Sequence, residues 1–296
     1  METILSTHGL TKHYGRIKAV NDLNLEIKKG TVFGLLGPNG SGKTTTLGMI
    51  LDVINKTSGS YKWFGEEPTK EHRKNIGAIL ETPIFYPYLS GAKNLELVCD
   101  IKKVNYSRID EVIIQVGLKG REDDKFRTYS LGMKQRLSIA SALLCDPAVM
   151  ILDEPTNGLD PQGIAAIREL IIEIAKSGKT IVLASHLLDE VQKVCTDFSV
   201  LKQGKMIYTG SVAEVTKGTT SIEVMADDPI KEILEEASFI TSVKEELGKF
   251  MVTLEEGKDS KDLNQLLIDK GVIVSHLNTI HKSLEKQFLE VLKESA

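Results

Sequence analysis

The sequence predicts an α/β fold built on a parallel sheet, with a helical insertion and a small α+β domain at the C-terminal end. Three short apolar runs have the composition of buried parallel strands, at residues 31–36, 149–153 and 180–184. The first run leads into a glycine-rich segment, and the second ends in two carboxylates. Between Gly65 and Pro147 the strand pattern gives way to helical spacing.

Composition excludes several classes of protein. The chain has 296 residues, of which 41% are hydrophobic, enough for one substantial domain and a smaller one. A net charge of −4 argues against a nucleic-acid partner. The longest apolar runs are far shorter than the roughly twenty residues that span a bilayer. The first residues lack the basic and apolar regions of a signal peptide, and three widely separated cysteines favour a reducing cytoplasm.

The segment Gly37–Thr44 reads Gly-Pro-Asn-Gly-Ser-Gly-Lys-Thr, which fits the phosphate-loop pattern. A strand that ends in such a turn and opens a helix points several backbone N–H groups at one spot. The alternative is a glycine-rich turn with an incidental lysine. The pattern predicts an ATP site in which the lysine reaches the β- and γ-phosphates and the threonine binds Mg²⁺. The residues concerned are Gly37, Pro38, Asn39, Gly40, Ser41, Gly42, Lys43, Thr44 and Thr45.

The run 149–153 ends in Asp153-Glu154-Pro155. A parallel strand presents its functional side chains at its C-terminal edge, so these carboxylates are expected beside the phosphate loop. We interpret Asp153 as a ligand of Mg²⁺ or of its water, and Glu154 as a general base or water-positioning group. Two capping carboxylates would not explain the phosphate loop that precedes them.

With these motifs the chain resembles the nucleotide-binding subunits of ABC (ATP-binding cassette) transporters. The resemblance covers roughly residues 1–219, and residues 220–296 form a separate accessory domain. It implies a P-loop NTPase core with an antiparallel β subdomain and a helical subdomain at about 88–147. Helices are predicted there at 92–102 and 107–116.

Two further motifs support the resemblance. Tyr14, in Lys-His-Tyr-Gly, stands where the family has an aromatic residue that stacks on adenine; an ordinary half-buried strand tyrosine is the alternative. Residues 129–136 stand in the place of the family signature, Leu-Ser-Gly-Gly-Gln, although Leu131 and Met133 depart from it. Ser130 and Gly132 are retained, at the start of a helix that would point at a phosphate. The alternative is that Ser130 only caps a structural helix, and one serine can have both roles at once.

Two loops complete the series. Gly158-Leu-Asp160-Pro161 resembles the loop that couples two facing subunits, although a capping aspartate before a helix-initiating proline also explains it locally. His186 follows the run 180–184 and matches the histidine that senses the γ-phosphate. An isolated histidine is usually structural, but this place in the motif series favours a ligand contact.

Glu81 is a departure from the family. Most members carry there a glutamine that contacts Mg²⁺ and the attacking water, whereas this chain reads Leu-Glu-Thr-Pro. Either the equivalent position lies a few residues away, or a carboxylate replaces the amide as a metal ligand and binds the metal more strongly. A glutamate here, with the Ser-Leu-Gly-Met signature, resembles the ATPases of bacitracin-type and lantibiotic self-protection exporters.

The resemblance implies an ATPase that binds ATP and Mg²⁺ and works as a homodimer or heterodimer. It also implies a polytopic membrane permease as partner, an exported substrate such as a peptide antibiotic or drug, and a place on the cytoplasmic face of the cell membrane. Two alternatives remain. One is a soluble ABC ATPase that acts on nucleic acid or ribosomes, which the absence of a basic stripe disfavours. The other is a regulatory cassette that binds ATP without turnover.

The segment 84–88, Ile-Phe-Tyr-Pro-Tyr, is an aromatic cluster with two interpretations. It is either a surface for the membrane subunit or a packed loop.

The C-terminal part differs in charge. Residues 221–296 carry a net charge of −7, whereas the first 220 residues carry +3. We predict strands at 221–225, 240–243, 249–254 and 272–277 and helices at 230–237, 260–270 and 282–293. This order suits a small ferredoxin-like domain with one extra helix.

Overall fold

The computed structural model describes residues 2–80, 84–216, 221–227, 229–246, 248–255 and 257–280. The chain divides into two compact units, the first ending at Val212 and the second beginning at Ala213. The strands of the first unit are β1 (Thr3–Tyr14), β2 (Ile17–Lys28), β3 (Val32–Leu36), β4 (Ser58–Trp63), β5 (Ile76–Ile79), β6 (Val149–Asp153), β7 (Thr180–Ser185), β8 (Asp197–Lys202) and β9 (Lys205–Ser211). Its helices are α1 (Lys43–Ile50), α2 (Lys70–Lys74), α3 (Gly91–Lys102), α4 (Ser107–Gln115), α5 (Leu131–Leu143), α6 (Pro161–Lys176) and α7 (Leu188–Val194), with a 3-10 turn at Phe126–Thr128.

A six-stranded sheet forms the centre of the first unit, in the order β5-β6-β7-β3-β8-β9. All neighbouring pairs are parallel except β8 with β9. Strands β3, β6 and β7 are buried along their whole length, because helices cover both faces of a parallel sheet. The three apolar runs therefore form the strands that the sequence predicts, each within a residue of its expected bounds.

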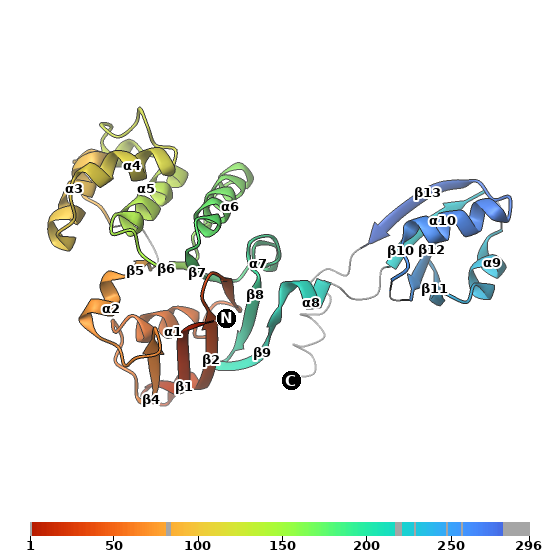
Figure 1. Cartoon of the computed structure of the whole chain (residues 1–296), viewed down its shortest axis with the longest axis horizontal. Helices are drawn as coiled ribbons and strands as arrows, with labels where there is room; N and C mark the ends of the chain where they lie inside the picture. The colour runs from red at the N-terminus through yellow and green to blue at the C-terminus, as the bar shows by residue number, and fades with distance from the viewer. Residues whose placement is uncertain are drawn as a thin grey trace. The chain divides into compact units, whose positions relative to one another are not determined.

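A smaller antiparallel sheet, β2-β1-β4, lies on the side of α1 (Figure 1). One hydrophobic core joins this sheet, α1 and the adjoining face of the parallel sheet. The buried Trp63 of β4 donates its indole N–H to the carbonyl of Ile50 at 2.8 Å, which fixes the end of α1 against the sheet. The first helix after the phosphate loop is thus held between two sheets.

The opposite face of the parallel sheet is covered by α7. A Cβ added to Gly34 of β3 would lie 2.9 Å from Val191 Cγ1 and 3.0 Å from Cys195 Sγ. Only glycine allows so close an approach of helix to strand. This contact fixes the segment that follows β7 relative to β3.

Helices α3, α4 and α5 form the helical subdomain and lie together, apart from the antiparallel sheet (Figure 1). The two helices predicted at 92–102 and 107–116 are confirmed, each within one residue at either end. Arg136 of α5 donates to the carbonyl of Val116 at 3.0 Å, which joins α5 to the end of α4.

Helix α8 (Val212–Thr216) begins at the last residue of the first unit. The second unit contains the rest of α8 and β10 (Ser221–Ala226), α9 (Lys231–Glu236), β11 (Ile240–Glu246), β12 (Lys249–Leu254), α10 (Ser260–Asp269) and β13 (Val274–Ile280). Between 221 and 280 the elements follow the predicted order, although the last strand begins two residues later than expected. The antiparallel sheet runs β11-β12-β10-β13 over its own core. The helix predicted at 282–293 lies outside the described residues. Within the described part of the chain, no helix is both long and apolar enough to cross a membrane.

Candidate nucleotide-binding and catalytic site

The segments that follow β3, β6 and β7 meet at one edge of the parallel sheet. In the register of the sheet, Leu36 of β3 is paired with Ser185 of β7, and Asp153 of β6 with Ala184. The amide of Gly37 donates to the carbonyl of Ser185 at 3.3 Å. Strand register alone therefore brings together the phosphate loop, the carboxylate pair and the histidine segment.

The phosphate loop has the backbone geometry that its glycines permit. Gly42, the N-cap of α1, has a φ of 108°, and a Cβ there would lie 2.4 Å from the carbonyl oxygen of Ala19 on β2. A Cβ on Gly37 would lie 2.4 Å from the carbonyl oxygen of Leu201 and 2.6 Å from Ser41 Oγ. Pro38, Asn39 and Gly40 are exposed at the tip, and Thr44 and Thr45 are half-buried in the first turn of α1.

Lys43 is buried beneath this loop. Its ammonium donates to the carbonyl of Gly37 at 2.7 Å and to that of Pro38 at 3.3 Å. The same Nζ lies 3.2 Å from Glu154 Oε1. The lysine thus links the phosphate loop to the carboxylate at the end of β6.

Glu154 is held in an unusual backbone conformation. Its φ is 48°, in the left-handed region that residues other than glycine rarely adopt, and its amide donates to the carbonyl of Ala184 at 3.0 Å. The sharp turn ends β6 and directs the side chain across the sheet edge. Oε2 lies 2.8 Å from His186 Nδ1, so one carboxylate contacts both the lysine and the histidine. Such backbone strain is retained where the surroundings over-determine it, and it is common at active sites.

Asp153 and Thr44 are the oxygen donors suited to a metal at this edge. Asp153 is the last residue of β6 and is 1% exposed, and Thr44 is the second residue of α1. A carboxylate and a hydroxyl match the hard-oxygen preference of Mg²⁺, which keeps waters and substrate phosphates as its other ligands. Within the described residues, no cluster of three or more His, Cys, Asp or Glu could hold a metal by itself. The donor set fits Mg²⁺ carried by a nucleotide.

Tyr14 ends β1, in the hairpin whose return strand contributes Ala19 to the contact with Gly42. The ring is 48% exposed, and Lys12 Nζ lies 4.8 Å from its centroid. An exposed ring face beside a cation can stack on a base.

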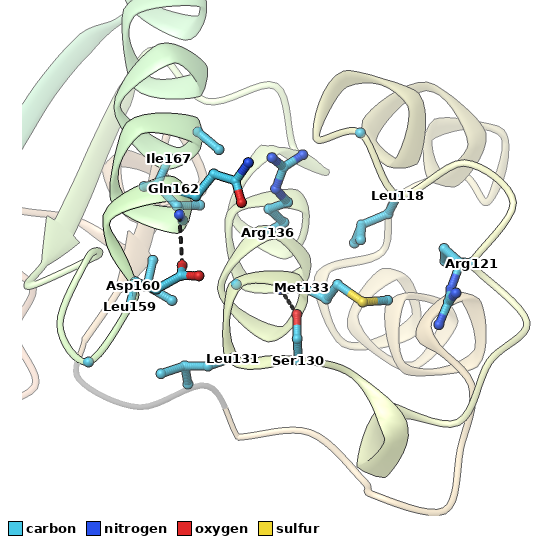
Figure 2. Close-up of a pocket in the computed structure, with 15 residues that line it drawn as sticks. Leu118, Arg121, Ser130, Leu131, Met133, Arg136, Leu159, Asp160, Gln162 and Ile167 are labelled. Carbon is cyan, nitrogen blue, oxygen red and sulfur yellow. Dashed lines mark hydrogen bonds between the residues drawn. The ribbon is translucent and has the colours of Figure 1, made fainter.

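Ser130 and Asp160 lie away from the phosphate loop, at the N-terminal ends of two neighbouring helices. Ser130 Oγ accepts from the amide of Met133 at 3.2 Å, and the Asp160 carboxylate accepts from the amide of Gly163 at 2.8 Å. Both residues line one pocket of about 530 Å³, to which Leu131 also contributes; Figure 2 shows its lining side chains. Gly132 lines the same pocket, whereas no residue of the phosphate loop does. The helix caps predicted at Ser130 and Asp160 are confirmed.

Tyr129 anchors the segment before this pocket. Its hydroxyl donates to the carbonyl of Arg121 at 2.7 Å, and burial raises the pKa of the phenol to about 12. The hydroxyl therefore remains a hydrogen-bond donor at physiological pH.

Two parts of the sequence-based prediction need comment. Glu81 lies outside the described residues. In the cluster 84–88, Phe85 packs edge-on against Phe126 with ring centroids 5.2 Å apart, whereas Ile84 is 94% exposed and Tyr86 and Tyr88 are also exposed. The cluster thus contains one packed ring and an exposed apolar surface.

Sequence reasoning overlooked Glu190 and Thr156. Both are buried, and the Thr156 hydroxyl donates to the Glu190 carboxylate. A glutamate within the apolar face of α7, next to Val191, is the signal that could have identified this contact.

Comparison with known proteins identifies the family. An ABC transporter family model matches residues 20–157. The bacitracin transport ATP-binding protein BcrA of Bacillus licheniformis is 38% identical, over 99% of this chain and 98% of its own length. This chain belongs to the ATP-binding proteins of ABC transporters. The lantibiotic transport ATP-binding protein SrtF of Streptococcus pyogenes is 40% identical over 70% of this chain and 93% of its own length.

Solved ABC structures share the fold. The cbiO1 protein of Clostridium perfringens, part of the cbiONQ ABC transporter complex, is 29% identical, with a TM-score of 0.65 over 73% of this chain and 91% of its own. A dimeric ATP-binding cassette in a post-hydrolysis state, bound to ADP and Pi, is 26% identical, with a TM-score of 0.63 over 71% of this chain and 99% of its own. The chain is therefore an ATP-binding subunit of an ABC transporter, and its activity is ATP hydrolysis.

Proposed function

We propose that this ABC ATPase powers export of a peptide antibiotic or drug through a separate membrane permease. The observation that carries the proposal is the continuous contact from Lys43 through Glu154 to His186, at the sheet edge that the phosphate loop occupies. A lysine, a carboxylate and an imidazole in this order can bind a γ-phosphate, activate a water and respond to phosphate release. A cassette that only binds ATP would not need this carboxylate.

The residues have distinct roles. The backbone of residues 37–42 surrounds the phosphates, Lys43 contacts the β- and γ-phosphates, and Tyr14 stacks on adenine. Glu154 acts as general base or orients the attacking water, and His186 contacts the γ-phosphate. Thr45 adjoins the metal-binding hydroxyl in the first turn of α1.

Thr44 and Asp153 hold Mg²⁺ together with the phosphates, and Glu81 is proposed as a further ligand. When bound there, Mg²⁺ would neutralise charge on the phosphate oxygens. The burial of Asp153 supports this assignment, because a buried carboxylate at a strand end needs a cation or donors nearby.

A second ATPase chain completes the site. Ser130, Gly132 and Asp160 line a pocket to which the phosphate loop does not contribute, so within one chain the two groups are separate. Two chains facing head to tail would bring the signature helix α5 of one against the nucleotide held by the other. The partner is a second copy of this chain or a related ATPase.

The permease docks on the exposed apolar side chains Ile84, Tyr86 and Tyr88. Their loop is held in place by the buried Asn94, whose carboxamide accepts from the amide of Tyr86 at 2.8 Å and donates to its carbonyl at 3.1 Å. A fixed loop that presents apolar side chains to solvent is typical of an interaction surface. Docking would place the ATPase on the cytoplasmic face of the cell membrane.

We also propose that residues 220–296 form a ferredoxin-like accessory domain. The β-α-β-β-α-β order and the antiparallel sheet order β11-β12-β10-β13 support this assignment. The second compact unit begins at Ala213 and therefore includes all of α8 but its first residue. Similarity to the bacitracin transport relative extends over 99% of the chain, this domain included, which favours a bacitracin-type peptide as substrate.

Co-purification tests the permease assignment. The tagged chain is purified from detergent-solubilised membranes of its own cell, and we expect a polytopic membrane protein in fixed ratio. Ile84→Asp should abolish this recovery, whereas Ile101→Asp, at another highly exposed isoleucine, on α3, should not. Recovery only from the soluble fraction, or with ribosomes, would support the non-transport alternative.

Antibiotic susceptibility tests the substrate class. Deletion of the gene should lower the inhibitory concentration of bacitracin or of a lantibiotic. Wild-type chain should restore it, and Glu154→Gln should not. Equal susceptibility to all tested peptides would exclude this substrate class while leaving the ATPase assignment intact.

A further inference from the structure

We propose that Glu190, a buried carboxylate on α7, is a positioning residue that holds Glu154 and His186 in register for hydrolysis. The inference rests on the proposed roles of those two residues.

The Glu190 carboxylate bridges two segments of the chain. It is only 3% exposed. Oε1 accepts a hydrogen bond from the hydroxyl of Thr156, and Oε2 accepts one from Ser185 Oγ at 2.8 Å. Both oxygens are therefore engaged, each by a different segment.

Each bridged residue lies next to a proposed catalytic residue. Thr156 is two residues after Glu154, in the turn where the Asn157 amide donates to the Glu154 carbonyl at 3.1 Å. Ser185 directly precedes His186, and its Oγ also accepts from the amide of Leu187 at 3.0 Å. The carboxylate thus ties the backbone on both sides of the 2.8 Å contact between His186 Nδ1 and Glu154 Oε2.

Apolar packing alone would hold α7 in place without burying a charged group. Val191 and Val194 of the same helix are buried, and Val191 contacts the β3 strand at Gly34. A buried carboxylate instead loses its hydration, and its hydrogen bonds only offset that loss. What the hydrogen bonds add is direction, because they fix two hydroxyls relative to each other in a way that apolar contacts do not.

The backbone of Glu154 explains why such a tie is needed. Its φ of 48° is strained for a residue with a side chain and persists only where neighbouring structure holds it. When the tie from Thr156 is lost, the turn can relax and move the carboxylate away from His186. A displacement of about 1 Å at a reacting group can cost on the order of 10²-fold in rate.

The experiment compares three purified full-length variants with the wild type. Thr156→Val removes one hydrogen bond and keeps the shape of the side chain, and Glu190→Gln keeps the volume but not the paired acceptors. Ser199→Ala is the matched control, since Ser199 is a fully buried serine of β8 whose hydroxyl hydrogen-bonds with the hydroxyl of Thr209 on the neighbouring strand β9. Turnover of Mg-ATP, the Kd for ATP and the thermal unfolding midpoint are measured for each.

We expect Thr156→Val and Glu190→Gln to lower kcat by about 10-fold or more, with the Kd for ATP within about twofold of wild type. Ser199→Ala should retain wild-type kcat even if its thermal unfolding midpoint falls as far as those of the other two variants. If Glu190→Gln does not fold, Thr156→Val decides. Wild-type kcat in Thr156→Val, or an equal loss in Ser199→Ala, would overturn the proposal.

A double variant separates positioning from a general effect on the fold. If Glu190 acts through Glu154, then Thr156→Val combined with Glu154→Gln should turn over no more slowly than Glu154→Gln alone, because the interaction has already been lost. A further drop of about 10-fold would assign Thr156 and Glu190 a purely structural role. Wild-type turnover in Glu154→Gln itself would instead refute the proposed catalytic role of Glu154, whatever Thr156→Val does.

Discussion

The ammonium of Lys43 lies 3.2 Å from the carboxylate of Glu154, across the edge of the parallel sheet. The pair joins the first turn of α1 to the end of β6, two segments more than one hundred residues apart. A nucleotide phosphate that reached the lysine would therefore lie beside the carboxylate. Recognition of phosphate and activation of water are placed together by the register of β3, β7 and β6.

Glu154→Gln should separate binding from hydrolysis. The amide keeps the size of the side chain and can still contact Lys43 and His186, but it cannot accept a proton. We expect turnover to fall by about 10²–10⁴-fold while the affinity for ATP is retained. Phosphate release and equilibrium nucleotide binding measure the two quantities. The control is Glu169→Gln, at an exposed glutamate of α6, which should behave as wild type. Parallel losses of ATP binding and turnover in Glu154→Gln would contradict a role of Glu154 in the chemical step.

Much of this edge could be predicted because local sequence determines it. Positions 37 and 42 require glycine, because a Cβ at either would lie 2.4 Å from a backbone carbonyl oxygen. Such requirements can be recognised as a glycine pattern in the sequence. Apolar runs such as 149–153 are long enough to indicate buried strands, and parallel strands present their functional groups at one edge. The helix caps at Ser130 and Asp160 are likewise local, since each side chain bonds to an amide three residues on.

Contacts between distant segments could not be predicted from local pattern. The bond between Thr156 and Glu190 spans 34 residues, and neither residue belongs to a motif that the sequence presents. The left-handed φ of Glu154 was also unexpected, because a glutamate before a proline gives no local signal for it. The surface around Ile84 stayed ambiguous in sequence, since alternating aromatic and apolar residues fit both a packed and an exposed loop.

Tyr14→Ala should weaken nucleotide binding without slowing the chemical step. Stacking of a base on an aromatic ring contributes about 1–3 kcal/mol, so we expect the Kd for ATP to rise by roughly 5- to 150-fold. At saturating ATP, kcat should be unchanged, and Tyr14→Phe should bind nearly as the wild type does. Ile17→Ala, at the exposed residue paired with Tyr14 in the same hairpin, is the control. The Kd is measured by titration of a fluorescent nucleotide. An unchanged Kd in Tyr14→Ala would mean that Tyr14 is an ordinary strand residue that does not contact the base.

Alanine at Gly42 should destabilise the first unit more than alanine at Gly40. Both glycines have positive φ, 108° and 78°, which costs an alanine about 1–2 kcal/mol. At Gly42 the new Cβ would also lie 2.4 Å from the Ala19 carbonyl oxygen, whereas at Gly40 no atom lies within 4 Å. Urea unfolding should therefore show a larger loss for Gly42→Ala, together with loss of ATP binding. Gly178→Ala, with φ 90° and open space, should show only the smaller cost and bind ATP normally; equal losses at Gly42 and Gly40 would mean that β2 does not constrain the loop.

Cys195 should make the unfolding free energy decline at alkaline pH. Burial first, and the neighbouring Glu190 carboxylate second, raise the pKa of its thiol well above the ordinary value. The folded protein therefore keeps the proton to higher pH than the unfolded chain does. The stabilisation is complete below the unfolded pKa of about 8.5 and is lost as pH rises toward the folded pKa, with a slope of about 1.4 kcal/mol per pH unit. Burial also raises the pKa of Cys99, which adds in the same direction.

The window between about pH 8.5 and pH 10 separates the contribution of the cysteines from that of the tyrosines. The buried phenols of Tyr61 and Tyr129, each with a pKa raised to about 12, contribute only above the ordinary tyrosine pKa of about 10. Urea unfolding across the window should show a shallower decline for Cys195→Ala than for wild type. Ser199→Ala, at a buried residue of β8 that does not titrate, should keep the wild-type slope. The same slope in Cys195→Ala as in wild type would mean that the Cys195 thiol, packed against Gly34 beneath the phosphate-loop strand, is reached by solvent.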